Sequence, residues 1–155
     1  MKEVWKEILD RLEEKNRYLM EIEKISEKML QMEVEELEQA MEKRAELLEK
    51  VGKEDVCLRE MCATDQRARD LLNHNQLPQT EDEQKLYDGS LKVKATANRI
   101  YQGEATLKQY MEHKKSQILD KIQELNKRGA GAIRGYSQVL STGSKTESKN
   151  FSKNF

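Results

Sequence analysis

The sequence predicts an all-α fold: an elongated antiparallel bundle of three or four long helices, followed by a flexible C-terminal tail. Charged residues make up 37% of the 155 residues and apolar residues 36%, whereas aromatic residues make up only 5%. Through most of the chain the apolar residues recur three and four positions apart, which is the spacing of one face of a helix. Pro78 is the single proline. This composition is typical of long helices and coiled coils and disfavours the compact core of a globular enzyme.

The first helix is predicted to begin near Lys2 or Glu3 and to end near Leu30. Its main apolar seam is widened on one flank by a second set of apolar side chains. A stripe of this width is typical of a helix that packs against two neighbours rather than of a two-stranded zipper. The seam consists of Trp5, Ile8, Leu12, Leu19, Ile22 and Met29, and the flank of Leu9, Tyr18 and Ile25.

The second helix is predicted to begin near Glu33, where a Glu-rich turn suits the positive end of a helix dipole. No Gly or Asn marks a break before it, so a break and a continuous helix both fit the sequence. We expect this helix to end within residues 73–78, because Asn73 favours a C-terminal cap and the proline excludes helical geometry for the residue before it. Its apolar stripe consists of Val34, Leu37, Met41, Ala45 and Leu48.

The third helix has the clearest start signal in the chain. Thr80 lies three residues before Glu83, which is the spacing of a capping box. We expect the helix to end near Gly129, because glycine commonly follows the last helical residue. Residues 1–128 are therefore predicted to form one helical-bundle domain. The seam of this helix consists of Leu86, Val93, Ala97, Ile100, Leu107, Met111, Ile118, Ile122 and Leu125.

Residues 129–155 differ in composition from the rest of the chain. They are rich in Gly, Ser, Lys and Asn, and their few apolar residues follow no period. Because so little apolar surface is available to offset the entropy of ordering, we predict a disordered tail. Its aromatic residues either anchor the tail on a partner or are incidental; they are Tyr136, Phe151 and Phe155.

Signatures of catalysis and of metal binding are missing from the sequence. It contains no Gly-rich phosphate loop, nucleophile elbow or His-Glu metalloprotease motif. Di-iron helical bundles require a Glu three residues before a ligating histidine. Neither His74 nor His113 has one. We expect no enzymatic activity, no metal site and no cofactor. Cys57 and Cys62, five residues apart, are expected to be free thiols beside a helical seam.

The charge and hydropathy patterns also limit the classes of partner. No basic stripe with interleaved aromatic residues is present, so we expect no nucleic-acid binding. No apolar run approaches the ~20 residues that cross a bilayer, so we expect no membrane insertion. The first 15 residues lack the apolar stretch of a secretory signal, so we expect a cytosolic protein. The seven methionines either fill the core or give a surface that adapts to different helices.

The segment Tyr18–Val51 resembles the N-terminal half of FlgN-type and FliT-type flagellar type III export chaperones. Lys43-Arg44 followed by Glu46-Leu47-Leu48 matches their second-helix pattern, and the Gly/Ser stretch with an aromatic-plus-lysine ending is similar to Gram-positive members. The chain departs from the pattern at Met32-Glu33, where such chaperones commonly have Gly-Asp. The resemblance implies a chaperone that binds C-terminal amphipathic helices of hook–filament junction or cap subunits and delivers them to the export apparatus.

Two hypotheses follow for the use of the apolar seams. In the first, the protein is a monomer or weak homodimer, and part of the third predicted helix stays accessible to a partner helix. The residues expected to bind that partner are Ile100, Leu107, Met111, Ile118, Ile122 and Leu125, together with Tyr136. In the second, the protein is a structural coiled-coil adaptor, and self-association uses all of its seams.

Overall fold

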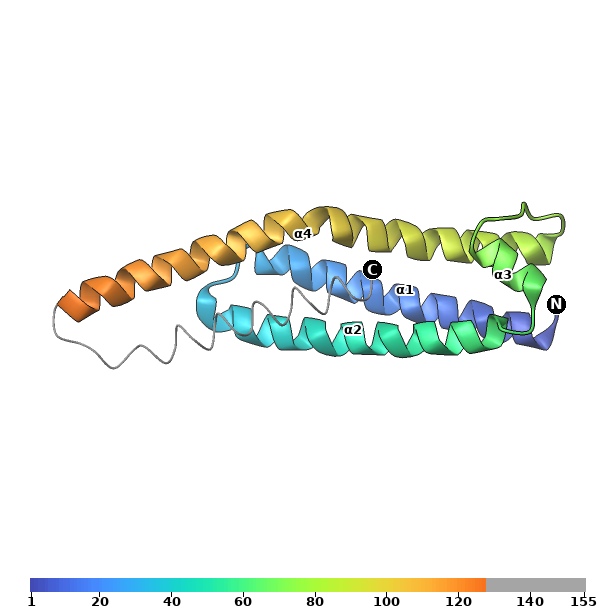
Figure 1. Cartoon of the computed structure of the whole chain (residues 1–155), viewed down its shortest axis with the longest axis horizontal. Coiled ribbons are helices and arrows are strands. Elements are labelled where there is room, and N and C mark those ends of the chain that lie inside the picture. The colour runs from blue at the N-terminus through green and yellow to red at the C-terminus, as the bar shows by residue number, and fades with distance from the viewer. Residues whose placement is uncertain (128–155) are drawn as a thin grey trace.

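The computed structural model describes residues 1–127 and contains four helices in that range (Figure 1). They are α1 (Glu3–Met29), α2 (Val34–Cys62), α3 (Gln66–Leu72) and α4 (Glu81–Lys127). The described part of the chain has no strand, so the predicted all-α bundle is confirmed. The predicted tail, 129–155, lies outside the described residues.

α1 lies between α2 and α4 and packs along both of them, whereas α2 and α4 make few contacts with each other (Figure 1). α2 runs antiparallel to α1, and α4 runs parallel to α1. This arrangement explains the wide apolar stripe predicted for the first helix, because one face of α1 serves two neighbours. The buried side chains of α1 are the predicted seam: Trp5, Ile8, Leu12, Leu19, Ile22 and Met29.

α1 and α2 are separated by a short connection between Met29 and Val34. The sequence was compatible both with this break and with a continuous helix. The backbone N–H groups of Leu30, Gln31 and Met32 donate to carbonyls three residues earlier, so the end of α1 tightens into a turn. α4 holds this turn, because the hydroxyl of Tyr110 donates to the carbonyl oxygen of Met32 at 2.6 Å. The two helices are therefore a hairpin rather than one continuous rod.

The second predicted helix is interrupted, which corrects the expected end within residues 73–78. α2 ends at Cys62, and the short helix α3 begins after Asp65. One carboxylate oxygen of Asp65 accepts the N–H of Ala68 at 3.0 Å, and the other accepts the indole N–H of Trp5 at 2.8 Å. Asp65 therefore caps α3 and ties it to the start of α1, a contact between residues far apart in the sequence.

The signals expected around residue 73 end α3 instead. Asn73 is the C-cap of α3, and His74 after it has a φ of 60°, in the left-handed region. The N–H of Asn75 donates to the carbonyl of Asp70, and the N–H of His74 to that of Leu71. These two bonds form a Schellman motif, in which glycine is the usual residue at the left-handed position.

The predicted start of the last long helix is confirmed. The hydroxyl of Thr80 accepts the N–H of Glu83 at 3.2 Å. The carboxylate of Glu83 accepts the N–H of Gln79 and two bonds from the guanidinium of Arg67 in α3. Arg67 also donates to the carbonyl of Leu77 at 3.0 Å. A single arginine therefore links α3, the loop that follows it and the first turn of α4.

α4 is longer than its neighbours. Its 47 residues span about 70 Å, whereas the 27 residues of α1 span about 40 Å. The ammonium group of Lys114 pairs with Glu33 at 3.1 Å, close to the α1–α2 connection. Beyond that pair, α4 continues through residues 115–127, which at 1.5 Å per residue is about 20 Å of helix. Figure 1 shows this end of α4 projecting past the end of α1. We call this part of α4 the overhang.

Candidate helix-binding groove

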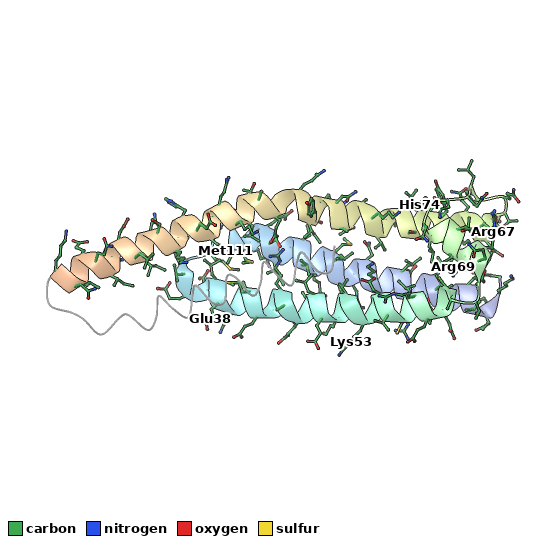
Figure 2. All side chains as sticks on the ribbon, in the orientation of Figure 1. Glu38, Lys53, Arg67, Arg69, His74 and Met111 are labelled. Carbon is green, nitrogen blue, oxygen red and sulfur yellow. The ribbon has the colours of Figure 1, made fainter. Side chains whose placement is uncertain are left out.

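The apolar seam of α4 meets the beginning of α2 at a surface groove. Two adjoining hollows lie there, and the larger has a volume of about 270 Å³. We call their combined surface the distal groove. Figure 2 shows Met111 on the side of α4 that faces α2, whereas Glu38 lies on the outer side of α2. The apolar side chains of the distal groove are Val34, Leu37 and Met41 of α2 and Met111, Ile118, Ile122 and Leu125 of α4.

Three of the residues predicted to bind a partner are buried, and two of them, Ile100 and Leu107, pack in the hydrophobic clusters of the bundle. Ile100 is 4% exposed and belongs to the main core between α1 and its neighbours. Leu107 is 3% exposed and packs with Met29 and Leu37 in a smaller cluster at the α1–α2 connection. Both side chains are therefore used for internal packing.

The remaining predicted residues of α4 lie along the distal groove. Met111 packs partly against the smaller cluster, and Ile118 contributes to both hollows. Ile122 lines the larger hollow but is itself buried, at 8% exposure, whereas Leu125 is partly exposed and lines the same hollow. Tyr136 lies outside the described residues.

The α2 side of the groove was missed when the sequence alone was considered. Val34 and Met41 belong to the stripe predicted for the second helix, which we expected to support the fold rather than to line a site. No local signal distinguishes them, because Val34 and Met41 have the same helical spacing as the buried members of that stripe, such as Leu37 and Leu48.

The rim of the distal groove carries charges of both signs. Glu33 and Glu35 line it on the α2 side, and Lys114 and Lys121 on the α4 side. The hydrogen bond to the carboxylate of Glu33 raises the pKa of Lys114, while burial opposes the shift. An apolar floor between charged edges fits an amphipathic helix better than a uniformly charged ligand.

An ion pair crosses from α2 to α4 at the inner end of the distal groove. The guanidinium of Arg44, which is 1% exposed, donates to the carboxylate of Glu104 at 2.7 Å. Arg44 lies between Met41 and Leu48 of the second-helix stripe, and Glu104 lies between Ile100 and Leu107 of the third-helix seam, so each is a charged interruption of an apolar seam. Sequence spacing within each helix does not show that the two interruptions pair with each other. The pair connects two helices that otherwise make few contacts with each other.

Other candidate chemistry is sparse in the described part of the chain. Among residues 1–127, no group of three His, Cys, Asp or Glu side chains could hold a metal ion. Cys57 and Cys62 are both free, and burial raises the pKa of the Cys62 thiol. In the same range, every helix is too polar or too short to cross a membrane.

Comparisons with known proteins do not assign this chain to a family. The chain matches no family model, and neither the curated proteins nor the solved structures contain a significant match. The resemblance of residues 18–51 to export chaperones thus stays a prediction from the sequence.

Proposed function

We propose that this protein is a cytoplasmic flagellar export chaperone of the FlgN/FliT type. It binds the C-terminal amphipathic helices of hook-associated subunits at the hook–filament junction or cap, prevents their early assembly and delivers them to the export apparatus. The observation that supports the proposal is the distal groove, where the apolar seam of α4 continues beyond the last residue of α1. A partner helix in that position lies between the start of α2 and the overhang.

Recognition in the distal groove relies on apolar burial. A partner helix presents Leu, Ile or Met at positions i, i+3, i+4 and i+7, and these side chains pack on Ile118 and Leu125. Burying about 600 Å² of apolar area at ~25 cal/mol per Å² gives a gross term near 15 kcal/mol. Losses of translational, rotational and side-chain freedom remove much of it, which leaves micromolar to nanomolar affinity. The step requires no covalent chemistry.

A pair of adjacent substitutions tests the proposal. Ile118→Asp puts a carboxylate on the apolar floor of the groove, and we expect it to weaken co-purification with hook-associated subunits at least tenfold. Leu119→Asp is the matched control, because Leu119 is 37% exposed and does not line either hollow. Leu107 is unsuitable for this test, since an Asp there would disrupt the core. Equal retention of the subunits by both variants would exclude the groove.

A structural adaptor is the second candidate function. The overhang supports it, because about 20 Å of helix with an apolar seam can also pair with a second copy of the chain. The chaperone proposal predicts a monomer or weak homodimer by light scattering. A stable tetramer that Ile118→Asp dissociates would favour the adaptor instead.

A further inference from the structure

A second hollow lies between α2 and α4 at the opposite end of the bundle. It has a volume of about 590 Å³, and α1 forms its floor while α3 closes its end. We call it the α3-end groove. It is separate from the distal groove, because the Arg44–Glu104 pair crosses from α2 to α4 between them. Its apolar lining includes Leu12 of α1, Leu58 and Cys62 of α2, Leu72 of α3 and Val93 of α4.

Positive charge dominates the edge of the α3-end groove. Lys15 and Asp55 line it and form an ion pair at 2.5 Å, so their charges offset each other. Arg59, Arg69 and Lys94 complete the charged lining, and Asp55 is the one carboxylate among the described residues that line it. By contrast, residues 1–127 as a whole carry 23 Lys and Arg against 28 Asp and Glu.

Two of these cations form hydrogen bonds to side chains that do not neutralise their positive charge. Arg69 donates to the side-chain oxygen of Gln66, and Lys94 lies 2.9 Å from Nδ1 of His74. An amide oxygen accepts a hydrogen bond without neutralising a charge, and so does an imidazole nitrogen. Figure 2 shows Arg69 and His74 at the α3 end of the bundle, whereas Lys53 points away from the outer side of α2.

We propose that the α3-end groove binds an amphipathic helix of a partner protein whose apolar face is flanked by Glu or Asp residues. α1 packs along both α2 and α4, which scarcely contact each other, so the three helices form three sides of a four-helix arrangement. The partner helix takes the fourth position at the α3 end. Its apolar side chains contact Leu58 and Leu72, and its carboxylates face Arg59, Arg69 and Lys94.

A designed peptide pair tests the charge preference with the full-length chain. The probe is a labelled helical peptide of about 18 residues with Leu at the a and d positions and Glu on both flanks. Its matched counterpart carries Lys on the flanks. We expect the Glu peptide to bind at least tenfold more tightly by fluorescence anisotropy, with an affinity that falls as salt is added. Equal binding of the two peptides, or tighter binding of the Lys peptide, overturns the proposal.

Charge reversals on the protein locate the binding site. We expect Arg59→Glu to weaken binding of the Glu peptide at least tenfold, and Arg69→Glu to do the same from a different helix. Lys53→Glu is the matched control, because it makes the same charge change on the outer side of α2 and should alter the affinity less than twofold. A loss equal to that of Arg59→Glu in this control would overturn the proposal, because net charge would then explain the binding. Thermal unfolding of each variant confirms that the fold is kept.

Two further measurements distinguish peptide binding in the α3-end groove from binding in the distal groove and from self-association of the chain. Because both peptides carry the apolar pattern proposed for the distal groove, the pair is also measured on the Ile118→Asp variant. The preference for the Glu peptide should persist there, and its loss in that variant would place the peptide in the distal groove instead. If the chain alone forms a stable dimer that Arg59→Glu dissociates, a second copy occupies the groove and the proposal is wrong. This inference does not depend on the proposed export function.

Discussion

Asp65 shows how one side chain decides where a helix ends. Burial raises the pKa of its carboxyl, but hydrogen bonds from the N–H of Ala68 and the indole of Trp5 outweigh it, and the net pKa is lowered. The carboxylate therefore stays ionised while it caps α3 and binds α1. Its local partner is readable from the sequence, because Asp is a common N-cap. Its partner Trp5 is 60 residues away, so the sequence alone did not indicate the break between α2 and α3.

Replacing Asp65 by Ala should destabilise the bundle. The change removes the cap of α3 and leaves the indole N–H of Trp5 without its acceptor, and we expect a loss of roughly 1–3 kcal/mol in the free energy of unfolding. Urea unfolding followed by circular dichroism measures it. Asp10→Ala is the control, because Asp10 is exposed on α1. A loss below about 0.5 kcal/mol for Asp65→Ala would contradict this assignment.

Glu83 gives the bundle a specific dependence on pH. The hydrogen bonds from Arg67 and from the N–H of Gln79 lower the pKa of its carboxyl from the usual 4.5 to about 2. Because the pKa is lower in the folded state, the stability that Glu83 contributes is complete above pH 4.5 and is lost as pH falls toward 2.

The Glu83→Gln variant should therefore melt below the unmodified protein at neutral pH. We expect the difference between their melting temperatures to shrink as pH falls through the interval from about 4.5 to about 2, and to vanish below it. Thermal melts of both proteins across this range measure the effect. A difference that is constant with pH would show that the ionised carboxylate is not the source of the stability.

At the scale of elements, the sequence predicted the helices whose signals are local. The seam of α1 and the capping box at Thr80 placed two helix starts within a residue or two. Which α4 side chains are accessible depends instead on where α1 ends, a relation between elements rather than a local signal. Ile100 and Leu107 were therefore grouped with Ile118, although α1 covers the first two and ends before the third.

Gly103 lowers the helix propensity of α4, and no neighbouring element packs so closely against it that a glycine is needed. A Cβ atom at this position would meet no atom within 4 Å, and the residue is exposed in mid-helix. We expect Gly103→Ala to raise the free energy of unfolding by roughly 0.5–1 kcal/mol, because alanine has the higher helix propensity. The reciprocal change at an exposed neighbour, Ala105→Gly, should lower it by a similar amount. Urea unfolding measures both, and the same sign for the two variants would contradict this explanation.

For the whole molecule, the unequal lengths of the helices create the surfaces proposed for binding. α4 extends past α1, and α2 stands apart from α4, so the bundle has grooves at both ends of one side. The overhang lacks the α1 neighbour that supports the rest of α4, and a helical segment of about 13 residues is only marginally stable in water. We therefore expect its backbone amides to open more readily than those of the bundle core.

Hydrogen exchange of the overhang tests the central claim most directly. It is measured on the full chain, alone and with the C-terminal helix of a hook-associated subunit. The account predicts that amides of residues 115–127 exchange rapidly in the free protein and become protected on addition of that helix, while amides of α3 do not change. Full protection of the overhang in the free protein, or exchange that the added helix leaves unaltered, would contradict the account.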